Sequence, residues 1–150
     1  MLEPILVSVL LVAITVVIHA FGTTQWMRFM GLRYVGCDGN FKAGKSLPAI
    51  IWTAVTLLML HVVEVVVWAV AYLLLSPINS LDTFEKATYF SMVTFTTLGY
   101  GDITLPEHEW RMMSGIEALN GILLVGWTTA FLFAVVQRTW SDAARGHGGD

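Results

Sequence analysis

Residues 81–102 read LDTFEKATYFSMVTFTTLGYGD, and this stretch decides the fold because it places a short helix and a glycine-rich turn inside an apolar chain. Asp82 stands at an expected helix N-cap, and Glu85 three residues later completes a pattern like a capping box. The pattern predicts a helix over residues 83–96, which ends where the turn at 97–102 begins.

The segment around this helix, residues 77–111, is too apolar for a simple solvent loop and too short to cross a bilayer twice. A short buried helix followed by non-helical backbone is tolerated at membrane depth only inside protein or beside water. Residues 77–111 are therefore interpreted as a re-entrant segment.

Three further stretches have the length of membrane-spanning helices. The 150-residue chain is 56% hydrophobic and 13% charged, whereas ordinary globular chains are roughly 45–50% apolar and about 25% charged. The stretches at 4–27, 48–76 and 112–138 carry almost no charge, and each reaches the roughly 20 residues that cross a hydrocarbon core. We therefore expect an all-α membrane protein with three transmembrane helices and a re-entrant pore helix.

The distribution of basic residues predicts an orientation. Only Lys86 and Arg111 belong to the side that holds the re-entrant segment. The other six are Arg28, Arg33, Lys42, Lys45, Arg138 and Arg145. Because cytoplasmic loops are enriched in Lys and Arg, we expect a basic, glycine-rich cytoplasmic loop at 28–47, a flexible cytoplasmic tail at 141–150 and an external N-terminus.

Thr97-Leu98-Gly99-Tyr100-Gly101 resembles the selectivity-filter signature of potassium channels, with leucine in place of valine. The likeness extends over residues 48–140, which resemble the two-helix pore module of bacterial potassium channels. There a spanning helix, a pore helix, the filter and a glycine-bearing inner helix follow one another. The first helix, residues 1–27, and the loop at 28–47 lie outside the likeness. The resemblance implies a homotetramer, because four such loops must surround one axis.

For function, the resemblance implies passive, selective conduction of K⁺ across a cell membrane, in bacteria the inner membrane. The permeant K⁺ ion would be bound by Thr97, Leu98, Gly99 and Tyr100, and no organic cofactor is expected. Membrane lipid is the expected surrounding. No soluble partner is inferred, and the net charge of −3 offers no basic surface for nucleic acid.

The spacing of the filter residues follows from the chemistry of a desolvated ion. Such an ion needs a replacement shell of oxygens, which backbone carbonyls supply if the chain runs extended with each carbonyl turned inward. Gly99 and Gly101 permit backbone angles that a Cβ would oppose, and Thr97 can add its hydroxyl at the inner end. Leu98 and Tyr100 are expected to point away from the ion and to pack against Tyr89, Phe90 and Val93.

Three acidic residues follow the filter. Asp102, Glu107 and Glu109 would form an outer mouth, repeated four times, that raises the local cation concentration. Asp102 matches the acidic position directly after the filter in the family that the chain resembles. Glu107 and Glu109 are equally well interpreted as solvated loop charges.

The predicted inner helix contains two glycines of interest. Gly121 and Gly126 resemble a hinge glycine and a second small residue below it, although close helix packing explains small residues equally well. Thr129, Phe133 and Val136 follow at helical spacing and are candidates for the pore wall and for an apolar constriction. A lipid-facing orientation of these three residues is the alternative.

We interpret Glu64 as the one acid inside the membrane, and His61 precedes it by one helical turn. Ionisable residues inside a membrane are costly and mark functional sites by default. One interpretation is a strut that bonds a neighbouring subunit or a pore-helix hydroxyl, from Ser91, Thr88 or Thr94. A second is a proton- or ligand-sensitive gate element. A third is a metal site at His61-x-x-Glu64, for which few other ligands are apparent.

Several other classes of function are disfavoured. Neither of the first two spans carries an arginine ladder, which argues against steep voltage sensing. No nucleophile with an orienting base is apparent, so we expect no enzyme. His19 is expected near the cytoplasmic end, packed or snorkelling. The rival functions are a subunit of a potassium transporter and a non-conducting membrane sensor or assembly protein.

Overall fold

The computed structural model describes residues 2–36, 39, 41–42, 44–75, 81–105 and 110–146. Within these residues the chain is helical, with four helices: α1 (Leu2–Tyr34), α2 (Ser46–Leu74), α3 (Phe84–Phe95) and α4 (Arg111–Gly146). α1, α2 and α4 are long and apolar enough to cross a membrane. The expected all-α membrane fold, with three spanning helices and one short helix, is confirmed.

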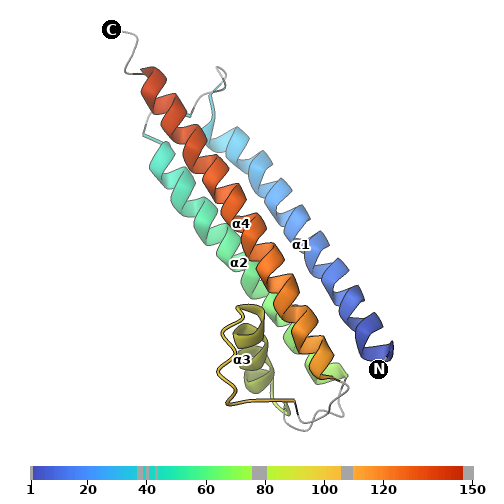
Figure 1. Cartoon of the computed structure of the whole chain (residues 1–150). Coiled ribbons are helices and arrows are strands. Elements are labelled where there is room, and N and C mark those ends of the chain that lie inside the picture. The colour runs from blue at the N-terminus through green and yellow to red at the C-terminus, as the bar shows by residue number, and fades with distance from the viewer. Residues whose placement is uncertain are drawn as a thin grey trace.

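The three long helices lie side by side, and α3 packs beside one end of this bundle (Figure 1). The beginning of α1, the end of α2 and the beginning of α4 are at that same end, whereas the turn that follows α3 starts at the end of α3 nearer the middle of the bundle and runs back beside α3. The connection after α1 and the end of α4 are at the opposite end. Residues 81–105 therefore return to the end from which they entered, as a re-entrant segment must.

The first helix is longer than expected. α1 continues to Tyr34, so that residues 28–34 are helical and only the later part of the segment 28–47 connects two helices. Charge at Arg28 and Arg33 ends the apolar stretch but does not end a helix. The continuation is stabilised by packing, because Met30 and Tyr34 are buried in a cluster with Ala49 and Val135.

The fourth helix is also longer than expected. Residues 141–146, predicted to belong to a flexible tail, continue α4, and residues 147–150 lie outside the described part. Two contacts tie this end of α4 to the connection after α1. The Asp142 carboxylate accepts from the Phe41 amide at 3.1 Å, and the Arg138 guanidinium donates to the Gly39 carbonyl at 2.9 Å.

The N-cap of α3 is Thr83, so the assignment of this cap to Asp82 was wrong. Thr83 has extended backbone angles, and its hydroxyl accepts from the Lys86 amide at 3.3 Å. Asp82 instead forms an ion pair with the Lys86 ammonium at 2.8 Å. The hydrogen bond from Lys86 lowers the pKa of the Asp82 carboxyl below its ordinary value. Aspartate and threonine are both favoured N-caps, and here backbone geometry selects the residue next to the helix.

A buried carboxylate joins α3 to both of its neighbours. Glu117 of α4 accepts from the Tyr72 hydroxyl of α2 at 2.7 Å and from the Ser91 hydroxyl of α3 at 2.5 Å. All three side chains are fully buried. Hydrogen bonds are stronger in a low-dielectric interior than in water, so Glu117 holds the short helix against the two long ones.

Gly121 allows α4 to approach the end of α3. A Cβ built at Gly121 would overlap the backbone carbonyl of Phe95, the last residue of α3, whereas a Cβ at Gly126 would meet open space. Of the two interpretations given to these glycines, close packing therefore applies to Gly121. At Gly126 none of the described residues makes such a contact.

We predict that Gly121→Ala destabilises the fold and that Gly126→Ala does not. The added methyl at 121 displaces backbone, and overpacking of this kind costs about 1–3 kcal/mol. Thermal unfolding of the two purified variants in detergent would measure the difference. Equal unfolding temperatures for the two variants would contradict the packing role of Gly121.

We also predict that Glu117→Ala lowers the free energy of unfolding by about 1–3 kcal/mol, because the buried Tyr72 hydroxyl loses its acceptor. Ser91 is affected less, since its hydroxyl also lies 3.0 Å from the Val65 carbonyl. Glu117→Gln keeps an acceptor oxygen and is expected to lose less stability. Denaturant titrations that give Glu117→Ala the same free energy of unfolding as the wild type would contradict this role of Glu117.

Candidate functional site

The turn after α3 is formed by amides that fold back on the helix. The Thr97 amide donates to the Thr94 carbonyl at 2.9 Å, and the amides of Leu98 and Gly99 both donate to the Val93 carbonyl, at 2.9 and 3.2 Å. These bonds satisfy carbonyls that a helix end leaves free. They also reverse the chain, so that residues 97–102 run back toward the end of the bundle at which α3 begins.

Backbone handedness alternates along this turn. Thr97, Gly99 and Gly101 have positive φ angles of 58°, 57° and 77°, whereas Leu98 and Tyr100 between them do not. An extended chain that alternates in this way can turn successive carbonyls to one side, unlike a β-strand, whose successive groups point to opposite faces. Thr97 is the one non-glycine with positive φ among the described residues, and such strained positions cluster at functional sites.

The side chains that alternate with these residues are largely uncovered by their own chain. Leu98 is 55% exposed and Tyr100 is 66% exposed. Their predicted packing around Tyr89, Phe90 and Val93 is only partly available within one chain, because Phe90 is buried in the core beside α2 and α4.

Asp102 directly follows the glycines and is held in place by α3. Its carboxylate accepts from the Tyr89 hydroxyl at 2.7 Å. This hydrogen bond lowers the pKa of the Asp102 carboxyl below its ordinary value. Asp102 lines an open cavity of about 510 Å³ between the turn, α3 and the first residues of α4. Glu107 and Glu109, the other predicted mouth residues, lie outside the described residues.

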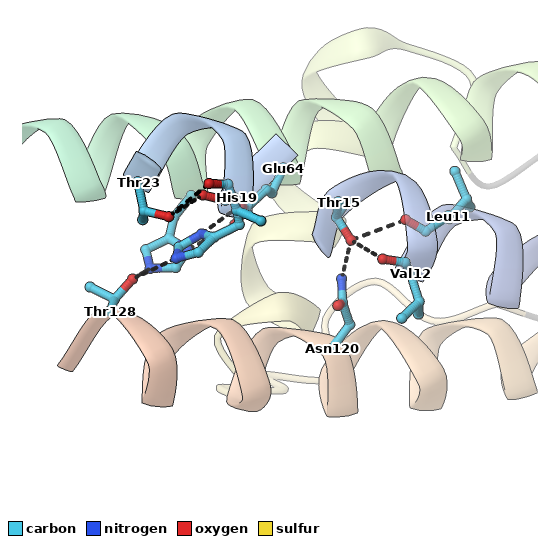
Figure 2. A network of polar contacts seen from close by, with 10 residues as sticks. Leu11, Val12, Thr15, His19, Thr23, Glu64, Asn120 and Thr128 are labelled. Atoms are coloured by element: carbon cyan, nitrogen blue, oxygen red, sulfur yellow. Dashed lines mark hydrogen bonds and ion pairs between the residues drawn. The ribbon is translucent and has the colours of Figure 1, made fainter. Parts of the chain in front are cut away.

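Glu64 has two histidine partners. Its Oε1 lies 2.8 Å from Nδ1 of His19, and its Oε2 lies 2.9 Å from Nδ1 of His61. Figure 2 shows Glu64 and His19 pointing toward one another, and both are fully buried. Ser91, one of the pore-helix hydroxyls named as possible partners of Glu64, bonds Glu117 instead.

His19 is packed and does not snorkel. It occupies the middle of α1, one of a series of buried polar residues that recur along this helix: Ser8, Thr15, His19 and Thr23. Thr15 accepts from the Asn120 amide of α4 at 2.8 Å (Figure 2). The helical spacing of these residues was visible in the sequence and could have indicated that one face of α1 is buried against protein.

The pore-wall candidates on α4 differ in exposure. Thr129 and Phe133 are exposed in the single chain, and Val136 is half-buried.

Thr128, which the sequence did not single out, lies instead among the histidines. Its hydroxyl is 2.9 Å from Nε2 of His61 and 3.4 Å from Nε2 of His19. Glu117 was likewise missed, although it is an acid inside a predicted spanning helix.

Comparison with protein families gives one assignment. A family described as "Ion channel" matches residues 58–138, just over half of the chain. The matched segment contains most of α2, all of α3 with the following turn, and most of α4, whereas α1 precedes it. No curated protein and no solved structure gives a significant match. With three helices able to span a membrane and a re-entrant segment between the last two, the chain belongs to this family of ion channels.

Proposed function

We propose that the chain is a potassium-selective channel that conducts K⁺ passively across a cell membrane. The observation that supports this most directly is the turn at 97–101, where the TLGYG sequence coincides with alternating backbone handedness. Carbonyls turned to one side can replace the hydration shell of a potassium ion. The function is transport, with K⁺ as the permeant ion.

The proposal requires four copies of the chain. One chain contributes one turn, and a ring of carbonyls around an ion needs several turns that share an axis. The large exposed fractions of Leu98 and Tyr100 are consistent with contacts to neighbouring copies. We therefore propose a homotetramer in which residues 97–101 of each copy surround the axis.

The outer mouth and the orientation follow from charge. Asp102 would lie at the external entrance, where its carboxylate raises the local cation concentration. Arg28 and Arg33 at the end of α1, with Lys42 and Lys45, would face the cytoplasm. The re-entrant segment and the N-terminus would then face outward. On α4, the exposed side chains of Thr129 and Phe133 would line the inner part of the pore.

We expect purified protein in liposomes to pass K⁺ in preference to Na⁺, and Gly99→Ala to remove that preference. Alanine at a φ of 57° costs about 1–2 kcal/mol in each copy and disturbs the carbonyls. Gly115→Ala is the matched control, because Gly115 lies on α4 with open space around it and should leave flux unchanged. Flux that is indifferent to Gly99→Ala, or equal for Na⁺ and K⁺, would refute the selectivity.

The mass of the protein in detergent tests the assembly separately. A tetramer of the 16.6 kDa chain is expected. A monomer or dimer would favour a transporter subunit or a non-conducting sensor over a channel.

For the outer mouth, we predict that Asp102→Asn lowers K⁺ conductance at low ionic strength, with a smaller effect at high salt because salt screens exposed charges. Asp82→Asn is the control, since Asp82 is also exposed but is paired with Lys86. A depressed pKa keeps Asp102 ionised at neutral pH. Its contribution should therefore be constant as the external solution is acidified, until the pH falls below the ordinary value of 3.8. If Asp102→Asn and Asp82→Asn have equal K⁺ conductance at low salt, Asp102 does not raise the local cation concentration at the entrance.

A further inference from the structure

Four side chains from three helices converge inside the bundle. His19 comes from α1, His61 and Glu64 from α2, and Thr128 from α4. The two imidazole rings are stacked, with centroids 5.4 Å apart, and both direct Nδ1 at the carboxylate and Nε2 at the Thr128 hydroxyl. Phe95 and Trp127 contact the imidazoles and supply apolar walls.

We propose that His19, His61 and Glu64 bind a divalent transition-metal cation of the kind represented by Zn²⁺. One ligand atom from each residue lies within 4.8 Å of the others. Two imidazole nitrogens and a carboxylate oxygen are a donor set that zinc favours, with a fourth position left for water. The site joins α1, which lies outside the family match, to the matched part of the chain.

The geometry needs little adjustment to admit the ion. Tetrahedral zinc holds its ligands at about 2.0–2.1 Å and therefore about 3.4 Å from one another. The present Nδ1–oxygen distances are 2.8 and 2.9 Å, as expected for hydrogen bonds. These two bonds run to different oxygens of Glu64, and one ligand atom from each of the three residues lies within 4.8 Å of the others, so binding draws the ligand atoms together by up to about 1.4 Å.

Thr128 is suited to hold the imidazoles in the required tautomer. A histidine that binds a metal through one ring nitrogen usually donates the other ring N–H to a nearby acceptor. The Thr128 oxygen, with two lone pairs, lies 2.9 Å from Nε2 of His61 and 3.4 Å from Nε2 of His19. It can accept from both, which leaves both Nδ1 lone pairs directed at the cation.

Charge favours a cation at this position. Glu64 is fully buried inside a membrane-spanning helix, where an isolated carboxylate is costly and needs positive charge nearby. Within the described residues, its ion-pair partners are the two histidines. A divalent cation compensates the carboxylate directly.

The test is binding of Zn²⁺ to the purified full-length protein in detergent, after treatment with a chelator. We expect one tightly held Zn²⁺ per chain, and Co²⁺ in its place should give the visible absorption of a four-coordinate site. His19→Ala should abolish stoichiometric binding. Thr128→Val, which preserves side-chain volume, should weaken affinity about 10–100-fold, as loss of a supporting hydrogen bond does at other metal sites.

The control is the double variant His108→Ala/His147→Ala, which removes the other two of the four histidines and should bind as wild type does. Absence of stoichiometric binding to wild type, unchanged binding in His19→Ala, or loss of binding in the control would overturn the proposal. If His19→Ala does not fold, the affinity of Thr128→Val decides. These measurements require no ion flux, so they stand whether or not the channel proposal fails.

Discussion

Backbone that leaves a helix inside a membrane must find partners for its polar groups, and the rest of the structure depends on meeting this constraint at the end of α3. The Val93 and Thr94 carbonyls accept amides from the turn, which lets the chain reverse. The turn can hold its shape only if α3 itself is fixed. Glu117 provides this from α4, and Gly121 allows α4 to lie directly against the last residue of α3.

α1 contributes a second polar layer, which the family match does not include. Its buried Thr15 bonds Asn120 of α4, and its buried His19 bonds Glu64 of α2. Interhelical hydrogen bonds of this kind associate helices where lipid supplies no hydrophobic driving force. α1 is thus packed through specific polar contacts, and removing it would leave Glu64 with one histidine instead of two. This dependence gives the extra helix a structural reason to be present.

The sequence predicted features that depend on local pattern and missed those that depend on distant partners. Apolar length predicted the three spans, and glycine spacing predicted the positive φ positions, although Thr97 shares that conformation. The end of α1 was misplaced because Arg28 and Arg33 end the apolar stretch but do not end the helix. Asp82 and Thr83 are equally good caps in sequence alone. His19 lies 45 residues from Glu64, so no local pattern could pair them.

The buried side chains of Glu64 and Glu117 lie on either side of one residue of α3, Phe95. Glu64 and Tyr72, the partner of Glu117, lie eight residues apart on α2, about 12 Å along the helix. Phe95 lies between the two groups: its ring contacts His61, and its backbone contacts Gly121. Phe95 is the last residue of α3 and precedes Thr97 by two residues. The His19–Glu64 cluster and the turn are therefore neighbours in space, although they lie in different parts of the sequence.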